Sequence, residues 1–283
     1  MSAFIDEFAV ARAAAGRTIR LPTGPHRGRS GDVRSSSVGS SLELHDFRQY
    51  QPGDDVRHID WNAVARTGEM ILRVRQDEVS PRVEVVLDAS SSMAVTARKA
   101  SRAAELALWL TQLARQGSRE LALFTSEKQP RRAMGTASQA LIRQLDFSSN
   151  EAFGLALRRM PPLQQSGVRI VVSDFLFEAD PLAVIQRLAR NTAGLVLIQL
   201  LDAEDENPTV STGAKLIDSE SGENFERLVD SELLDTYFKR FTAHVSSWKS
   251  AARQARATWC AVSSSDDIES LSRGSLSSLS EGA

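Results

Sequence analysis

The sequence has little that would cross-link its fold or hold it in a membrane. Its single cysteine, Cys260, excludes an internal disulfide and is typical of a reducing compartment. No stretch approaches the ~18 apolar residues of a membrane-spanning helix. The N-terminal residues also lack the sustained apolar run of a signal peptide. We therefore expect a cytoplasmic protein without a membrane span.

Net charge is nearly absent as well. The 34 basic and 36 acidic residues among 283 give a formal net charge of −2, which favours neither nucleic acid nor an acidic membrane surface as a partner. The arginines of residues 1–40 are not interleaved with aromatic side chains that could stack on bases. We interpret residues 1–40 as an N-terminal arm lying on the domain, and we expect no nucleic-acid partner.

Several enzyme signatures are missing. The chain has no G-x-S-x-G elbow, no H-E-x-x-H, no G-x-x-x-x-G-K-[ST] and no C-x-x-C. His45 and His58 lie in a charge-rich segment, where we expect them to form bonds within that segment rather than to act as bases. These absences favour a protein that is not an enzyme.

What the sequence does contain is an apolar run that stops at an acid. Residues 83–87, V-E-V-V-L, are typical of a strand covered on both faces, and apolar residues at helical spacing follow between 103 and 114. Asp88, Ser90 and Ser92 therefore lie at a strand-to-helix turn, where open α/β sheets bind ligands. Their oxygens suit a hard cation such as Mg²⁺ or Mn²⁺. The serine hydroxyls are equally suited to capping the next helix.

The same pattern recurs at residues 168–174, V-R-I-V-V-S-D, where a second apolar run ends in Asp174. Strands alternating with helices predict a mostly parallel sheet with helices on both faces, so both acids should meet at one edge of the sheet. Strands are expected at 83–88, 120–124, 168–174, 195–201 and 257–262, with a hairpin within 208–227. Helices are expected at 97–116, 137–147, 151–159, 181–190, 230–255 and 266–272, and disorder after Arg273.

Residues 41–80 form a β-rich segment of dense charge. Pro52-Gly53 makes a turn, and strand-like alternation precedes and follows it. We interpret the charges around Trp61 as an ion-pair latch that holds this extension to the core. Asp55, Arg57 and Trp61 are expected to be structural, with the indole buried, whereas Asp54 and Arg66 are expected to remain reachable by a partner.

The D-x-S-x-S pattern of Asp88, Ser90 and Ser92, with the later Asp174, resembles a von Willebrand factor A-type domain with a metal-ion-dependent adhesion site. The resemblance implies that the serines ligate the ion directly, that the acids act largely through water, and that a partner's carboxylate completes the shell. That family takes a threonine from the loop before a T-x-x-x-x-A-L helix. Aligning Ala156-Leu157 puts Glu151 there. Glu151 could ligate as a third acid, Ser149 or Asn150 could substitute, or the site could be metal-free.

Residues 48–68, R-Q-Y-Q-P-G-D-D-V-R-H-I-D-W-N-A-V-A-R-T-G, are similar to a bacterial family catalogued as domain of unknown function fifty-eight. Ser173-Asp174-Phe175 and the acidic segment 204–208 extend the resemblance, which runs from about Arg27 to Val262. It implies a partnership with a MoxR-type AAA+ ATPase. It also implies a von Willebrand factor A-like domain over 81–263, followed by a C-terminal helix and tail over 264–283.

Three functions follow from these observations. The first is a non-catalytic, Mg²⁺- or Mn²⁺-dependent protein-interaction module that serves the ATPase and an unknown protein client. The second is a phosphoryl-transfer hydrolase using Asp88, which is weaker because that chemistry usually places a second acid where this chain has Ser90. The third is a structural subunit whose metal site has decayed, for which Glu151 is the main support. Metal binding separates the first from the third.

Overall fold

The computed structural model describes residues 3–20, 46–51, 59–74, 82–163, 166–208, 216–217, 224–225 and 231–283. Contacts divide the chain into two units, one formed by Met1–Pro25 with Pro81–Ala283 and the other by His26–Ser80. Among the described residues, no helix combines the length and the apolar character needed to cross a membrane.

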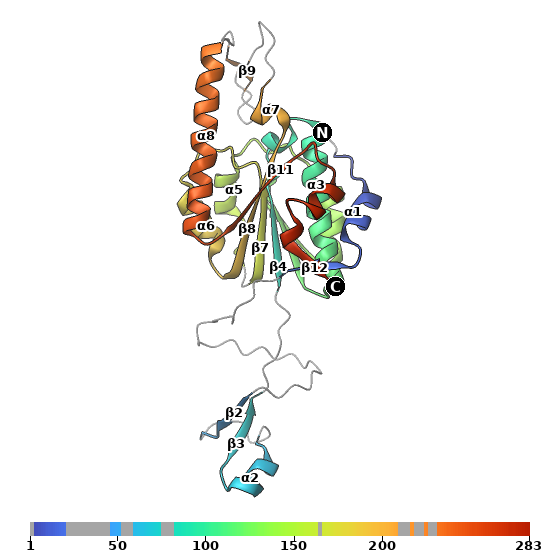
Figure 1. Cartoon of the computed structure of the whole chain (residues 1–283), viewed down its shortest axis with the longest axis vertical. Helices are drawn as coiled ribbons and strands as arrows, with labels where there is room; N and C mark the ends of the chain where they lie inside the picture. Colours follow the sequence, from blue (N-terminus) through green and yellow to red (C-terminus); the bar gives the residue numbers. More distant parts are fainter. Residues whose placement is uncertain are drawn as a thin grey trace. The chain divides into compact units, whose positions relative to one another are not determined.

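The larger unit is an α/β structure built on a six-stranded sheet (Figure 1). The strand order is β11-β8-β7-β4-β5-β6, and every neighbouring pair is parallel except β5 and β6. The strands of this sheet are β4 (Val83–Leu87), β5 (Leu121–Thr125), β6 (Arg131–Met134), β7 (Ser166–Ser173), β8 (Thr192–Leu201) and β11 (Thr258–Ser263). The prediction of a mostly parallel sheet is therefore confirmed.

Helices cover both faces of the sheet because the central strands are apolar on both sides. Val85 and Leu87 of β4 belong to one buried cluster, and Val86 between them belongs to the other. The first face carries α1 (Glu7–Ala14), α3 (Ala97–Gln116), α4 (Thr136–Arg143) and α9 (Ile268–Arg273). The second face carries α5 (Phe153–Arg159), α6 (Pro181–Ala189) and α8 (Ser231–Gln254).

Short elements complete this unit. The expected hairpin within 208–227 is represented by an antiparallel pair of two-residue strands. These elements are η2 (Ser91–Ala94), α7 (Ala203–Glu206), β9 (Leu216–Ile217), β10 (Asn224–Phe225) and η3 (Ser277–Leu279).

Two short strands near the two ends of the chain pair with each other. Strand β1 (Arg17–Ile19) pairs antiparallel with β12 (Ser280–Gly282). Leu276 and Leu279 are buried in the same apolar cluster as α1 and α3. The prediction of a disordered tail after Arg273 is thus wrong, because two buried leucines and a strand pairing fix a segment whose composition is mostly serine and glycine.

The smaller unit contains an antiparallel pair, β2 (Asp46–Gln49) with β3 (Ile71–Val74), and the helix α2 (Trp61–Thr67). The Asp60 side chain caps α2 by accepting hydrogen bonds from the backbone N–H groups of Asn62 and Ala63. Gly68 ends the helix in the left-handed conformation, with φ of 73°. Strands are thus present both before and after the predicted Pro52-Gly53 turn, as the sequence predicts.

Candidate functional site

Polar side chains follow four neighbouring parallel strands at the point where each strand ends. Asp88 follows β4, Asp174 follows β7, Asp202 follows β8 and Ser264 follows β11. All four are buried. Asp88 and Asp174 therefore share the carboxyl edge of the sheet, as their positions in the sequence predict.

The Asp88 carboxylate is held by hydrogen bonds on both of its oxygens. Oδ2 accepts from Ser173 Oγ at 2.6 Å, and Oδ1 accepts from Ser126 Oγ at 3.2 Å and from the backbone N–H of Ser90 at 3.0 Å. Ser173 is the last residue of the neighbouring strand, and Ser126 directly follows β5. Because both of its oxygens already accept hydrogen bonds, Asp88 is placed to orient the ligands or water molecules that bind an ion rather than to bind the ion directly.

Burial, together with the nearby negative charge of Asp174, raises the pKa of Asp88 to about 6. The hydrogen bonds from Ser173 and Ser90 act in the opposite direction, because they stabilise the carboxylate. A cation at this edge would favour the ionised form.

The hydroxyls of Ser90 and Ser92 lie beside this carboxylate. Their Oγ atoms are 3.0 Å apart, which is the spacing of a hydrogen bond between them. It is also close to the ~2.9 Å that separates adjacent ligands of an octahedral Mg²⁺ with bonds of ~2.0–2.1 Å. Ser90 is buried, whereas Ser92 is partly exposed, so the pair opens toward solvent. The two serines therefore fit the role of cis ligands.

A third serine, Ser149, lies opposite Ser90 through its backbone. The two residues form a parallel β-bridge, and the Ser91 backbone N–H donates to the Ser149 carbonyl at 2.9 Å. Within the part of the chain that the structure describes, Ser149 Oγ is buried without a hydrogen-bond partner. A buried hydroxyl without a partner is costly, and a bound ion would satisfy it. Of the three replacements weighed for the family threonine, Ser149 is the one with a buried hydroxyl that lacks a partner among the described residues.

Glu151 does not join this cluster through its carboxylate. Its Oε2 forms an ion pair with Arg159, a residue of α5 whose side chain is half exposed. Among the residues that the structure describes, no three His, Cys, Asp or Glu side chains gather as metal ligands would. The set of Asp88, Asp174 and Glu151 is thus not a three-acid site, and hydroxyls would have to supply the direct ligands.

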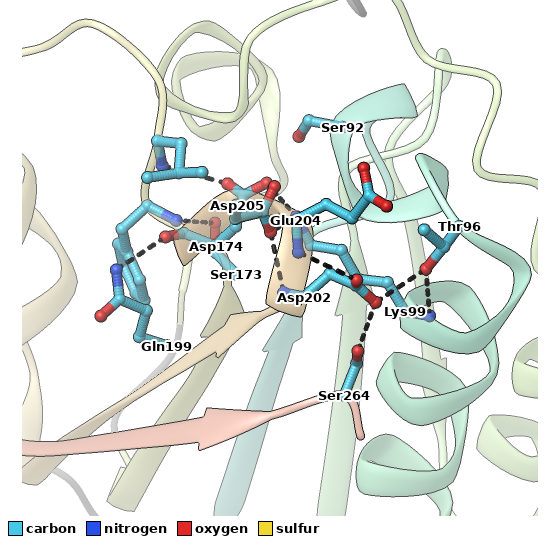
Figure 2. Close-up of polar contacts among 12 residues, drawn as sticks. Ser92, Thr96, Lys99, Ser173, Asp174, Gln199, Asp202, Glu204, Asp205 and Ser264 are labelled. Carbon is cyan, nitrogen blue, oxygen red and sulfur yellow. Dashed lines mark hydrogen bonds and ion pairs between the residues drawn. The ribbon is translucent and has the colours of Figure 1, made fainter. Parts of the chain in front are cut away.

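Asp174 already has a cationic partner, the buried side chain of Lys99 from α3 (Figure 2). Lys99 Nζ lies 3.0 Å from Asp174 Oδ2 and 2.8 Å from Asp205 Oδ2. Burial opposes the ammonium charge, but the two carboxylates outweigh it and raise the pKa of Lys99 above its ordinary value. The sequence reasoning missed Lys99, which lies among alanines and polar residues in the first turn of a helix.

A second network surrounds Asp202, which the sequence reasoning also missed (Figure 2). Its carboxylate accepts from Ser264 Oγ at 2.5 Å and from Thr96 Oγ1 at 2.9 Å, and it pairs with Arg98 at 3.2 Å. Although burial works against the charge, these bonds hold the pKa of Asp202 well below its ordinary value. The signal was present, because the apolar run 195–201 ends in this acid as the other two runs do.

The latch residues fall in the smaller unit. Asp54, Asp55 and Arg57 lie outside the described residues. Arg66 is exposed and its Nε donates to the Asn62 carbonyl at 3.2 Å, in keeping with a residue that a partner could reach. The expectation of a buried Trp61 is wrong, since its side chain is 62% exposed at the first position of α2. Helix α2 has no buried residue, so it offers the indole no apolar layer to enter.

Comparison with known proteins places residues 46–247 within a family described as "Protein of unknown function DUF58". The uncharacterized proteins Mb1516 of Mycobacterium bovis and Rv1480 of Mycobacterium tuberculosis are each 28% identical over 232 residues, which is 76% of this chain and 72% of theirs.

Solved structures give a weaker likeness. The conserved hypothetical protein BatB from Bacteroides thetaiotaomicron aligns with a TM-score of 0.40 and 13% identity over 70% of this chain and 98% of its own. An aerotolerance-related membrane protein from Bacteroides fragilis aligns at 0.38 and 13% over the same shares. Since the family model spans most of the sequence, from β2 to within α8, this chain belongs to the DUF58 family of proteins of unknown function.

Proposed function

We propose that this protein is a non-catalytic, Mg²⁺- or Mn²⁺-dependent interaction module with a von Willebrand factor A-like site. The observation that carries the proposal is the pair of hydroxyls of Ser90 and Ser92, 3.0 Å apart beside the buried Asp88, with the unpartnered hydroxyl of Ser149 on a residue whose backbone pairs with Ser90. Ser90 and Ser92 would bind the ion directly, with Ser149 as a third oxygen. Asp88 would orient bound water.

The chemistry of this ligand set favours an anionic partner. Neutral hydroxyls leave the charge of a divalent cation largely uncompensated, and Ser92 faces toward solvent. The ion would thus offer an open position to an aspartate or glutamate of another protein. Binding through the ion requires no group of this chain to form or break a covalent bond.

The hydrolase alternative fits the site less well. Asp88 would need a free carboxylate oxygen for attack, but it is buried and both oxygens accept hydrogen bonds. These features support a scaffolding role for Asp88.

The partner we propose is a MoxR-type AAA+ ATPase, with a further protein client. This part of the proposal rests on the resemblance of residues 48–68 and on the exposure of Arg66 and Trp61 within that stretch. The smaller unit would then contribute to partner choice, and the hydroxyl site would supply the metal-dependent contact.

The experiment is capture of the purified MoxR-type ATPase at constant Mg²⁺ and nucleotide. Because the ATPase itself requires Mg²⁺, the test compares variants rather than removing the metal. Ser90→Ala with Ser92→Ala should reduce capture at least about tenfold, since it deletes two direct ligands. Ser148→Ala, an exposed serine next to Ser149, is the matched control and should bind like wild type. Equal capture by the double variant and the control would refute a metal-dependent contact.

A further inference from the structure

Lys99 has an arrangement that a lysine rarely adopts. Its side chain is fully buried, and its ammonium lies between the carboxylates of Asp174 and Asp205 (Figure 2). The other Asp174 oxygen, Oδ1, accepts from the Leu176 backbone N–H at 3.1 Å. Both oxygens of Asp174 are therefore already used within the fold.

The ammonium is held from the opposite side as well. Asp205 Oδ2 accepts from Lys99 and also from the Asp202 backbone N–H at 2.8 Å. The Asp205 backbone carbonyl in turn accepts from the Tyr237 hydroxyl of α8 at 2.5 Å. These contacts fix Asp205, so Lys99 bridges two anchored acids. Moving it away would leave the buried Asp174 and the partly buried Asp205 uncompensated.

We propose that Lys99 is a resident cation that keeps Asp174 out of the coordination sphere of an ion bound at Ser90 and Ser92. The inference rests on the proposed metal site and adds a determinant of its affinity. Lys99 neutralises Asp174, an acid that could otherwise move to the ion, and its own positive charge repels a second cation. The ion is then held by hydroxyls in front of Asp88 alone.

The consequence is a site that binds metal weakly until a partner supplies a carboxylate. A direct ligand from Asp174 would satisfy the ion and lower its attraction for an external anion. With Asp174 paired to Lys99, the missing negative charge must come from outside. Metal binding and partner binding are thereby coupled, since each supplies a charge that the other needs.

The test is calorimetric titration of Mg²⁺ into Lys99→Met, which keeps most of the apolar stem of the side chain and removes its charge. We expect Mg²⁺ affinity, without any partner, to rise about tenfold or more because a Coulomb repulsion disappears and Asp174 is released. Adding Asp174→Asn to this variant should abolish the gain. Arg98→Met removes a neighbouring cation that pairs with Asp202 instead, and it should leave the affinity unchanged.

Melting curves provide a second readout that does not depend on the titration. Magnesium should raise the melting temperature of Lys99→Met more than that of wild type, because the ion takes over part of the role of the lost ammonium. If Lys99→Met does not fold, Lys99→Met with Asp205→Asn removes one of the two stranded acids and is compared in the same way.

The outcomes separate this inference from the proposed function. A folded Lys99→Met whose Mg²⁺ affinity equals or falls below that of wild type overturns the role of Lys99 while leaving the metal site intact. A gain that persists with Asp174→Asn also overturns it, because Asp174 is then not the released ligand. Absence of binding to wild type and to Lys99→Met alike overturns the metal site, and the inference with it.

Discussion

Ser173 Oγ lies 2.6 Å from Asp88 Oδ2 and joins the ends of two neighbouring parallel strands, β7 and β4. Both groups are buried, so the bond fixes the carboxylate at the edge of the sheet where the hydroxyls of Ser90 and Ser92 gather. The placement of the candidate site thus depends on a contact between residues that are far apart in the sequence.

Replacing Ser173 by Ala should destabilise the protein by about 1–3 kcal/mol, because Asp88 Oδ2 then loses its partner in the interior. Denaturant unfolding measures the change. Ser148→Ala is the control, since its exposed hydroxyl donates to the exposed Asp146, and its cost should be small. Equal unfolding midpoints for the two variants would show that the Ser173 bond contributes nothing.

Stability should depend on pH through Asp88. Its folded pKa of about 6 exceeds the ~3.9 of an unfolded aspartate, so its protonation favours the folded state. That contribution is fully present below pH ~4 and is lost as pH rises through about 6, an effect on the order of 2–3 kcal/mol. In metal-free buffer, the free energy of unfolding of wild type relative to Asp88→Asn should therefore fall between pH 4 and 7. A difference that is constant or rises with pH would contradict the burial argument.

Removing one partner of a buried ion pair in the middle of the sheet should strongly destabilise the protein. Glu84 and Arg169 lie opposite each other in β4 and β7, and Arg169 Nε is 2.8 Å from Glu84 Oε2. Arg169→Met should cost about 3–5 kcal/mol because it leaves Glu84 charged and buried. Arg82→Ala, in the more exposed pair with Glu120, should cost under about 1 kcal/mol. A mild effect of Arg169→Met in denaturant unfolding would mean that Glu84 is neutral or solvated.

The exposed residues of α2 should affect binding more than folding. Arg66→Ala and Trp61→Ala should each change the free energy of unfolding by less than about 1 kcal/mol, because neither side chain is buried. If the smaller unit contributes to partner choice, both variants should weaken capture of the MoxR-type ATPase. If both variants capture the ATPase as well as wild type does, Arg66 is not part of the proposed partner surface.

The main strands could be predicted because their runs are mostly apolar and each is followed by a polar residue. Strand β6 was missed, since Arg131–Met134 forms an antiparallel edge with neither an apolar run nor clear alternation. Strand β12 was missed because a serine-rich composition masked two buried leucines. In both segments, pairing with a distant strand decides the structure, and local sequence does not encode it.

The candidate site could likewise be predicted only in part. Asp88 and Asp174 could be placed together because carboxyl ends of parallel strands share an edge. Ser149 could not be chosen over Glu151, because a shift of two residues in a loop leaves no periodic signal. Lys99 could not be foreseen either, since a lysine in the first turn of a helix is ordinarily solvated, and only the approach of Asp174 and Asp205 makes it a buried cation.

The central claim is that hydroxyls in front of Asp88 bind a divalent ion, and calorimetric titration of Mg²⁺ tests it most directly. Wild type should bind Mg²⁺, while Ser90→Ala should lose a direct ligand and Asp88→Ala the group that orients bound water, each weakening binding about 10–100-fold. Ser148→Ala should retain the wild-type affinity. Mg²⁺ affinity that is equal in wild type and Asp88→Ala would contradict the account.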